Sequence, residues 1–147
     1  MNPQLPEALS GFTLDHIGVA VQSLSAALPF YQTLLGLEVL KTESVPTEQV
    51  EVAFLNTGDC HLELLEPTSD TSPIARFMAK RGPGIHHICL KVENLPALLD
   101  KLEQAGVQLI DRVPRPGAGN KRVAFVHPKA TGGILLELSE SLLTPDA

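Results

Sequence analysis

Two histidines and two glutamates recur at matched positions in two halves of the sequence. His16 and His87 lie 71 residues apart, and Glu63 and Glu137 lie 74 residues apart, each in or beside an apolar run. Side chains of a strand alternate between two faces, and the apolar neighbours of these residues mark the face that packs under a helix. We therefore expect all four polar side chains to lie together on the opposite face.

Two imidazoles and two carboxylates form a suitable donor set for a divalent ion such as Co²⁺, Ni²⁺, Zn²⁺ or Mn²⁺. Two carboxylates that face one dry cavity repel each other, and the pKa of one of them rises unless a cation neutralises the pair. A single His or Glu at the start of a strand is usually a surface residue. Four such residues at equivalent positions of a repeat, all on the same face of their strands, are better explained by a shared binding site. His16, Glu63, His87 and Glu137 are therefore predicted to hold one divalent ion.

The repeat extends beyond these four residues. A shift of 71 positions places residues 16–28 on 87–99, and residues 52–55 on 123–126. Each half is predicted to contain a strand, a helix and three further strands. The predicted strands are residues 16–21, 37–41, 50–55 and 61–65 in the first half, and 85–92, 107–113, 122–126 and 134–138 in the second.

Capping residues bound the predicted helices. The first helix covers residues 26–35, and Pro29 is expected to loosen its first turn. The equivalent helix of the second half follows the cap Asn94. Between the halves, Ser72 begins a short helix that Gly82 ends.

These elements predict an α+β fold. Two βαβββ modules, at about residues 13–67 and 84–140, are joined by the short helical linker within a single domain of residues 1–147. Each module alone would be marginally stable, so we expect a shared core. The expected architecture is a curled eight-stranded mixed sheet, a cup with helices packed outside. The Pro- and Gly-rich segment 114–120 is predicted to be a mobile loop.

Composition excludes several classes of function. The 147 residues are 44% hydrophobic and carry a formal net charge of −6, which argues against a nucleic-acid partner. No apolar run approaches the roughly 20 residues that cross a bilayer, and the N-terminus has no signal-peptide pattern. Two cysteines are too few for a disulfide framework. A cytoplasmic protein without a membrane partner is expected.

Four other histidine and cysteine residues near these strands are predicted to have roles outside the set of four ligands. His61 and His127 lie on or beside predicted turns and are expected to face solvent. His86 shares the outward parity of Ile88, so it is predicted to be structural or to support a ligand. Cys89 is predicted to be a small buried side chain, with a thiolate ligand as the alternative.

Several phrases of the sequence are shared with one known family. They are LDHIGVAV at 14–21, ELLEP at 63–67, SPIARF at 72–77, GIHHIC at 84–89, VHPK at 126–129 and LLEL at 135–138. The paired modules resemble the vicinal oxygen chelate superfamily, which includes glyoxalase I and extradiol dioxygenases. Within it the chain is similar to the methylmalonyl-CoA epimerase family from about Leu14 to Leu138.

This resemblance implies an isomerase that interconverts the (R) and (S) epimers of methylmalonyl-CoA through a metal-stabilised enolate. His16, Glu63, His87 and Glu137 correspond to the metal ligands of the family. Glu137 and Glu51, which is placed inward beside Glu63, would move the α-proton on opposite faces of the enolate. Co²⁺ is the expected ion, with Zn²⁺, Ni²⁺, Mn²⁺ or Mg²⁺ as alternatives.

The same four ligands also match bacterial-type glyoxalase I, so a lactoylglutathione lyase is the alternative enzyme. A non-catalytic ligand-binding protein of this fold is the alternative outside enzymes. Lys121, Arg122 and Lys129 lie near the last hairpin and could contact the phosphates of an acyl-CoA substrate. A homodimer is expected, because relatives in the superfamily are commonly dimers and open sheet edges favour pairing.

Overall fold

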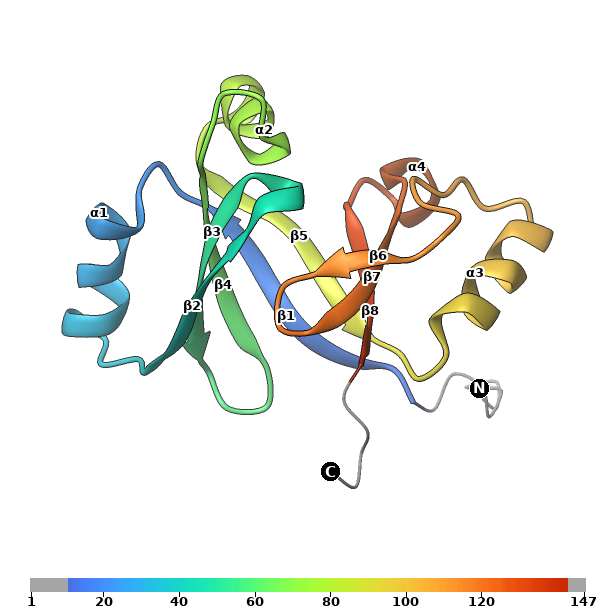
Figure 1. Cartoon of the computed structure of the whole chain (residues 1–147), viewed down its shortest axis with the longest axis horizontal. Coiled ribbons are helices and arrows are strands. Elements are labelled where there is room, and N and C mark those ends of the chain that lie inside the picture. Colours follow the sequence, from blue (N-terminus) through green and yellow to red (C-terminus); the bar gives the residue numbers. More distant parts are fainter. Residues whose placement is uncertain (1–10, 143–147) are drawn as a thin grey trace.

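One curled sheet of eight strands forms the centre of the molecule (Figure 1). The computed structural model describes residues 11–142. The strands of the first half are Thr13–Ala20 (β1), Val39–Val45 (β2), Val50–Asn56 (β3) and His61–Pro67 (β4). Those of the second half are Gly84–Lys91 (β5), Arg115–Gly117 (β6), Lys121–Val126 (β7) and Leu136–Ser141 (β8). The predicted α+β class and mixed eight-stranded sheet are confirmed.

The two halves repeat one set of strand pairings. The order across the sheet is β2-β3-β4-β1-β5-β8-β7-β6, so the halves meet where β1 and β5 pair in antiparallel fashion. β1 is parallel to β4, and β5 is parallel to β8. The two central strands therefore carry the two predicted histidine ligands.

Helices cover the outer side of each half (Figure 1). Leu24–Leu28 (α1) packs with the buried cluster of Ala53, Leu55 and Leu64. Leu95–Gln104 (α3) provides Leu95 and Leu99 to the equivalent cluster of the second half. Pro73–Arg81 (α2) and the short Pro128–Thr131 (α4) complete the named α-helices, and a 3-10 helix covers Pro46–Glu48. No helix within residues 11–142 is both long and apolar enough to cross a membrane.

The first predicted helix is divided at Pro29. Ser23 caps α1 by accepting a hydrogen bond from the backbone N–H of Ala26. Because Pro29 has no N–H, the α-helical ladder ends there, and Pro29–Leu34 continues as a π-helix. Leu35 N donates to Phe30 O at 3.0 Å, a bond that spans five residues. The prediction of one continuous helix with a loose first turn is therefore wrong, because an α-helix is followed by a π-helix.

The caps of the other two helices are confirmed. Ser72 Oγ accepts from Ile74 N at the start of α2, and Asn94 Oδ1 accepts from Ala97 N at the start of α3. Gly82 ends α2 with a φ of 75°, a left-handed value that glycine adopts without strain.

The strand predicted at residues 107–113 is wrong. This segment contains only one isolated bridge, between Leu109 and Val126. Ile110 N and Asp111 N both donate to the same Phe125 carbonyl, and the Asp111 side chain accepts from Phe125 N, so a side chain replaces the strand ladder. The short strand β6 lies further on, inside the segment predicted to be a loop.

Candidate functional site

Strand pairing brings two of the predicted ligands into one row across the sheet. His16 on β1 lies opposite both His61 on β4 and Cys89 on β5, and Cys89 lies opposite Glu137 on β8. Residues directly opposite each other project from the same face. His16 and Glu137 therefore share a face, with Cys89 between their strand positions.

A second row crosses the sheet at Gly18. Gly18 lies opposite Glu63 on β4 and opposite His87 on β5. A Cβ atom on Gly18 would lie 2.2 Å from Cε1 of His87, a distance that two heavy atoms cannot adopt without a shift. The absence of a side chain at Gly18 therefore provides the space that the His87 imidazole fills.

Gly18→Ala is accordingly expected to displace the His87 ring and to weaken metal binding about tenfold or more. Zn²⁺ affinity would be measured by competition with a chromophoric chelator. Gly11→Ala is the control, because its Cβ would approach only the flexible Glu93 side chain, at 3.2 Å. Equal Zn²⁺ affinities of the two variants would contradict the steric argument.

Nitrogen and oxygen donors converge where these rows meet. Nε2 of His16 lies 3.0 Å from Nε2 of His87, and Glu137 Oε1 lies 3.1 and 2.9 Å from these two atoms. All three side chains are buried. Donors that share one zinc-sized ion, each at about 2.0–2.2 Å from it, are separated by about this distance. The donor types and their spacing therefore fit a divalent ion.

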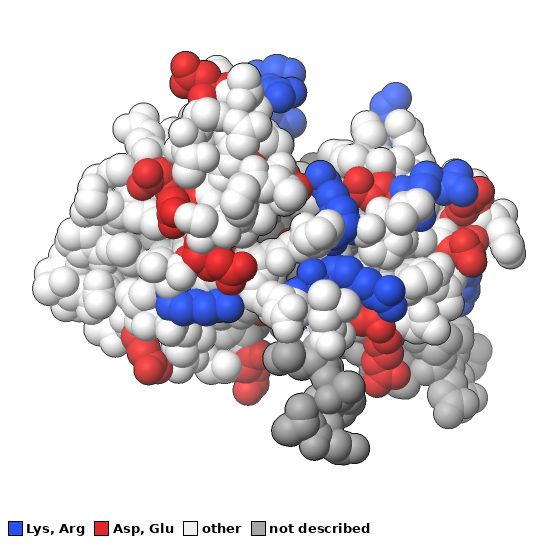
Figure 2. All heavy atoms as spheres, in the orientation of Figure 1, with Lys and Arg blue, Asp and Glu red and all other residues white. Residues whose placement is uncertain are grey.

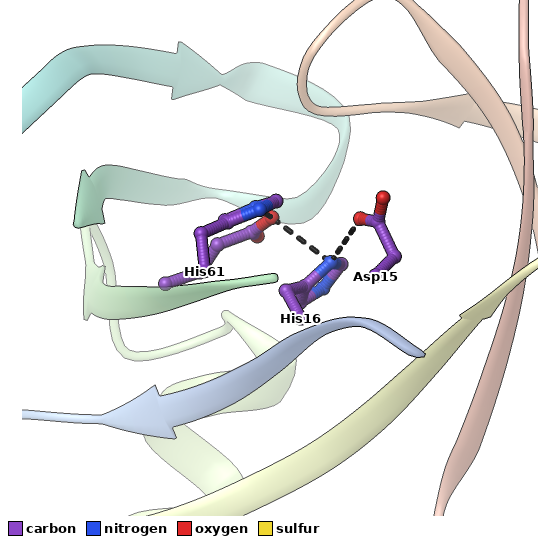
Figure 3. Close-up of side chains that lie close together, drawn as sticks. Asp15, His16 and His61 are labelled. Carbon is purple, nitrogen blue, oxygen red and sulfur yellow. Dashed lines mark hydrogen bonds and ion pairs between the residues drawn. The ribbon is translucent and has the colours of Figure 1, made fainter. Parts of the chain in front are cut away.

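Glu63 lies on the other side of His16. Its Oε2 is 2.8 Å from His61 Nε2 and 3.1 Å from His16 Nδ1. Asp15, His16, His61 and Glu63 form one group whose donor atoms lie within 4.8 Å of one another, and Figure 3 shows Asp15, His16 and His61 of this group close together. His16, His87 and Glu137 form a second such group. The structure thus brings the four predicted ligands together, with Glu63 turned toward His61.

His61 does not face solvent as expected. Its side chain is only 17% exposed, and its ring stacks on the His16 ring with centroids 5.1 Å apart. Because its Nε2 contacts the Glu63 carboxylate, His61 positions a predicted ligand. His127, by contrast, caps α4 by accepting a hydrogen bond from Lys129 N.

Asp15 fixes the orientation of the His16 ring (Figure 3). His16 Nδ1 lies 2.7 Å from Asp15 Oδ2, and Lys121 Nζ donates to the same oxygen at 2.7 Å. Burial alone would lower the pKa of His16, but hydrogen bonds, first of all with Asp15, raise the pKa to about 12. With Nδ1–H bound to a carboxylate, Nε2 is the nitrogen that faces His87 and Glu137.

Metal binding is expected to release at least one proton, and the apparent affinity is expected to rise about tenfold per pH unit between pH 6 and 8. The reason is that the raised pKa of His16 keeps both its ring nitrogens protonated at neutral pH, and an ion at Nε2 replaces one proton. Calorimetry in buffers of different ionisation enthalpy counts the protons released. A pH-independent affinity would contradict this protonation state.

A β-bulge in β5 turns His86 toward the cavity. Gly18 pairs with His87 and Val19 pairs with Ile85, so the register passes over His86. Its Nδ1 lies 2.9 Å from Nδ1 of His87. Burial, followed by the proximity of His87, lowers the pKa of His86 to about 4, so the ring is neutral at pH 7. The outward orientation predicted for His86 is wrong. The predicted contact with a metal-ligating residue is present, because His86 contacts His87.

Cys89 lies beneath the cluster and is fully buried, as predicted. Its Sγ lies 3.2 Å from the Ser139 hydroxyl oxygen. Burial raises the pKa of the Cys89 thiol to about 11, so it is protonated near pH 7. A protonated thiol is not a metal ligand, and Cys89 is best described as a small packing residue.

A cavity of about 260 Å³ opens in front of the donor cluster. Its walls are mainly apolar, with Val50 and Val52 of β3 on one side and Val123 and Phe125 of β7 on another. Among the described residues, its charged or ionisable lining consists of Glu48, Glu63, His86, His87, Arg115 and Glu137. Figure 2 shows basic side chains gathered in the middle of one face of the molecule, with acidic side chains close by.

Comparison with known proteins agrees with the fold. Residues 15–125 match the family described as Glyoxalase/Bleomycin resistance protein/Dioxygenase superfamily. The chain belongs to this superfamily.

The chain is similar over most of its length to several known proteins, and three of them follow. YqjC of Bacillus subtilis (strain 168) is 46% identical over 127 residues, which cover 86% of this chain and 91% of that protein. The ethylmalonyl-CoA/methylmalonyl-CoA epimerase of Cereibacter sphaeroides is 40% identical over 129 residues, covering 86% and 96%. A variant of Streptomyces coelicolor methylmalonyl-CoA epimerase, solved with 2-nitronate-propionyl-CoA, has a TM-score of 0.84 at 36% identity and covers 90% of this chain and 96% of its own. The resemblance to this epimerase family is confirmed.

Glu51 does not line the cavity in front of the donor cluster. The residue of β3 opposite Glu63 is Phe54, and Val52 is the neighbour of Glu51 that lines the cavity. Glu51 projects from the other face, where its carboxylate accepts a hydrogen bond from the Ser44 hydroxyl. The prediction that Glu51 points inward beside Glu63 is therefore wrong.

The three basic residues predicted to meet substrate lie outside the cavity lining. Lys121 pairs with Asp15, and Arg122 pairs with Glu140 at 2.8 Å. Lys129 lies in α4. Their contact with a CoA phosphate stays a prediction.

Sequence reasoning missed two charged residues that do line the cavity. Glu48 ends the 3-10 helix Pro46–Glu48, and Arg115 begins β6. Neither segment shows an alternating apolar pattern, so no face could be assigned to either side chain. Pro46, a residue favoured at the first position of a helix, was the available signal for the first of them.

Proposed function

We propose that this protein is a metal-dependent isomerase that interconverts the (R) and (S) epimers of methylmalonyl-CoA. The observation that carries the proposal is the convergence of His16, His87 and Glu137 donors at the wall of an apolar cavity, with Glu63 beside them. The epimerase activity named for the C. sphaeroides relative and the S. coelicolor neighbour supports this reaction for a chain of the same fold.

One divalent ion would be held by His16, Glu63, His87 and Glu137, and we propose Co²⁺ as the functional ion. When bound, such an ion acts as a Lewis acid that stabilises negative charge on the thioester oxygen, typically by several kcal/mol. Asp15 and His61 orient His16 and Glu63 through their side-chain contacts. Activity reconstituted separately with Co²⁺, Zn²⁺, Ni²⁺, Mn²⁺ and Mg²⁺ would rank the ions.

Glu137 is proposed to carry the proton on one face of the α-carbon. Burial alone would raise the pKa of Glu137, but hydrogen bonds from His16 and His87 hold the pKa well below its usual value. The side chain is therefore an ionised carboxylate at the cavity wall, the form that accepts a proton.

The cavity size indicates which part of the substrate enters. At about 260 Å³ it lies below the range of roughly 300–1,000 Å³ that encloses drug-sized ligands. We therefore place the methylmalonyl group inside and the CoA moiety across the surface. Lys121, Arg122 and Lys129 remain the proposed phosphate contacts.

Two assays run side by side test the activity. The reconstituted protein is incubated in D₂O with methylmalonyl-CoA, and both epimerisation and deuterium at the α-carbon are followed. The same preparation is given methylglyoxal and glutathione. Epimerisation with no lactoylglutathione formation is expected. Lactoylglutathione formation alone would assign glyoxalase I chemistry, and inactivity in both assays, with the ion bound, would indicate a binding protein.

We also propose that the protein is a homodimer. The sheet ends at β2 and β6, and open edges of this kind favour association with another chain. Light scattering coupled to size-exclusion chromatography gives the mass directly, and a monomer at micromolar concentration would contradict the proposal.

A further inference from the structure

The cavity in front of the donor cluster has one permanently charged basic group in its described lining, the guanidinium of Arg115. Three carboxylates line the same cavity, those of Glu48, Glu63 and Glu137. The proposed divalent ion would offset its two carboxylate ligands, Glu63 and Glu137. A malonyl thioester brings one more carboxylate, which needs a cation or hydrogen-bond donors when it leaves water. Arg115 is the side chain of the lining that can supply both.

Arg115 lies close to the donor cluster. It begins β6, the short strand that extends from the second half of the sheet toward the first (Figure 1). Its guanidinium lies over the Phe125 ring, with Cζ 5.1 Å from the ring centroid. The His87 ring packs edge-on against the same Phe125 ring, with centroids 5.9 Å apart. The guanidinium and a proposed ligand of the ion therefore contact one aromatic ring, and a small acyl group can reach both.

The guanidinium keeps N–H donors for a ligand. Nη1 of Arg115 contacts Glu48 Oε1 at 2.8 Å. Nε is buried, lies 3.3 Å from Asp111 Oδ2 and makes no hydrogen bond. Nη2 has no ion pair or hydrogen bond within residues 11–142. Because a guanidinium carries five N–H donors and this side chain is 39% exposed, a carboxylate that enters the cavity can reach unused ones.

The backbone and neighbours of Arg115 hold it in place before any ligand arrives. β6 lies tightly against β7, since a Cβ atom on Gly117 would lie 2.7 Å from Cγ1 of Val123. Asp111, which lies beside the guanidinium, is itself fixed, because its side chain accepts a hydrogen bond from Phe125 N at 2.9 Å. A donor that is already ordered loses less conformational entropy when it binds a ligand.

We propose that Arg115 binds the free carboxylate of the substrate and so selects malonyl thioesters over simple acyl thioesters; this rests on the proposed epimerase function. Hydrogen bonds between a guanidinium and a carboxylate are shorter and stronger than those between neutral groups. An acyl thioester without the second carboxylate gains nothing from Arg115. With its carboxylate held there, the malonyl group lies between Arg115 and the donor cluster, which places the α-carbon beside Glu137.

Malonyl-CoA and propionyl-CoA test the proposal, because they differ only in that carboxylate. Neither has an α-methyl branch, so neither can be epimerised, and calorimetry on the Co²⁺-loaded protein measures binding without epimerisation. The unmodified protein is expected to bind malonyl-CoA more tightly. Arg115→Gln should lose about 10–100-fold in affinity for malonyl-CoA and keep its affinity for propionyl-CoA within twofold. Arg115→Lys, which keeps the charge on a single nitrogen, should recover part of the loss.

Arg112→Gln is the matched control. Arg112 is an exposed arginine three positions away that pairs with Glu103 and lies outside the cavity lining. Its replacement should leave both affinities unchanged.

A second control addresses the charge of Glu48. Removing Arg115 leaves the Glu48 carboxylate without its partner, and that charge alone would repel malonyl-CoA. The double variant Glu48→Gln/Arg115→Gln removes both charges. It is expected to bind malonyl-CoA at least tenfold more weakly than Glu48→Gln alone. Equal affinities of the double variant and Glu48→Gln would assign the effect to repulsion and overturn the proposal.

Three further results would also overturn it. Equal affinities of the unmodified protein for the two thioesters would show that the carboxylate is not recognised. An Arg115→Gln variant that keeps its malonyl-CoA affinity would assign the carboxylate to the ion alone. Equal losses for both thioesters would reduce Arg115 to a structural role. The epimerase proposal is judged separately by turnover: a protein that binds malonyl-CoA through Arg115 but does not epimerise methylmalonyl-CoA would remove only the proposed reaction.

Discussion

His87→Ala is expected to lose the divalent ion and all measurable turnover while remaining folded. His87 supplies one of the two Nε2 atoms that lie 3.0 Å apart at the donor cluster. Its ring fills the space above Gly18 and takes no part in the apolar clusters beneath α1 and α3. Removing it therefore empties a ligand position without opening either helix-packed core.

Metal content by mass spectrometry, isothermal titration with Co²⁺ and thermal unfolding test this expectation together. His127→Ala is the control, because His127 caps α4 and lies outside the cavity lining. We expect that control to retain one ion per chain. A His87→Ala protein that still bound Co²⁺ with the original affinity would remove His87 from the ligand set.

The convergence of His16, His87 and Glu137 was predictable because it depends on two simple regularities. A duplicated module places equivalent residues at equivalent points of a pseudo-symmetric sheet, and period-two alternation assigns the face. On β8 the alternation is visible in the sequence. Leu138 belongs to the core beneath α3 and Leu136 packs against it, so Glu137 between them projects to the opposite face and lines the cavity.

The same reasoning failed for Glu51 because β3 is buried on both faces. Val52, Ala53, Phe54 and Leu55 are all almost completely inaccessible to solvent. A strand that is apolar on both sides has no hydrophobic alternation, so its inner face cannot be read from sequence. The bulge at His86 produced the second error, because one extra residue reverses the alternation locally and is not marked by any residue type.

The charged pair of Glu48 and Arg115 was beyond sequence reasoning for a different reason. The two residues are far apart in the chain and meet only because the curled sheet brings β6 toward the 3-10 helix before β3. The strand predicted at residues 107–113 would have placed that edge elsewhere. It is replaced by hydrogen bonds from Ile110 and Asp111 to Phe125, a tertiary arrangement with no periodic pattern in the sequence.

Glu137→Gln tests the most connected residue of the site. Glutamine keeps the size of the side chain but removes its charge, so the variant is expected to lose the proposed anionic ligand and the proposed proton carrier together. In the metal-free protein, hydrogen bonds from His16 and His87 outweigh burial and hold the pKa of Glu137 in the folded state well below its ordinary value of 4.5. Its ionised form therefore stabilises the fold at neutral pH, and this contribution diminishes as the pH falls below 4.5. The difference in unfolding free energy between the unmodified protein and Glu137→Gln, measured in urea, should narrow on acidification.

The decisive expectation for Glu137→Gln concerns isotope exchange. Glu137→Gln should exchange the α-proton of neither epimer for deuterium, because an enolate cannot form without the ion. Mass spectrometry of methylmalonyl-CoA recovered from D₂O, starting from each pure epimer, gives the two exchange rates, and the unmodified protein provides the reference rates. If Glu137→Gln instead kept its ion and exchanged the α-proton of only one epimer, Glu137 would be a proton carrier only. The ion would then be held without it, and the assignment of Glu137 as a ligand would be withdrawn.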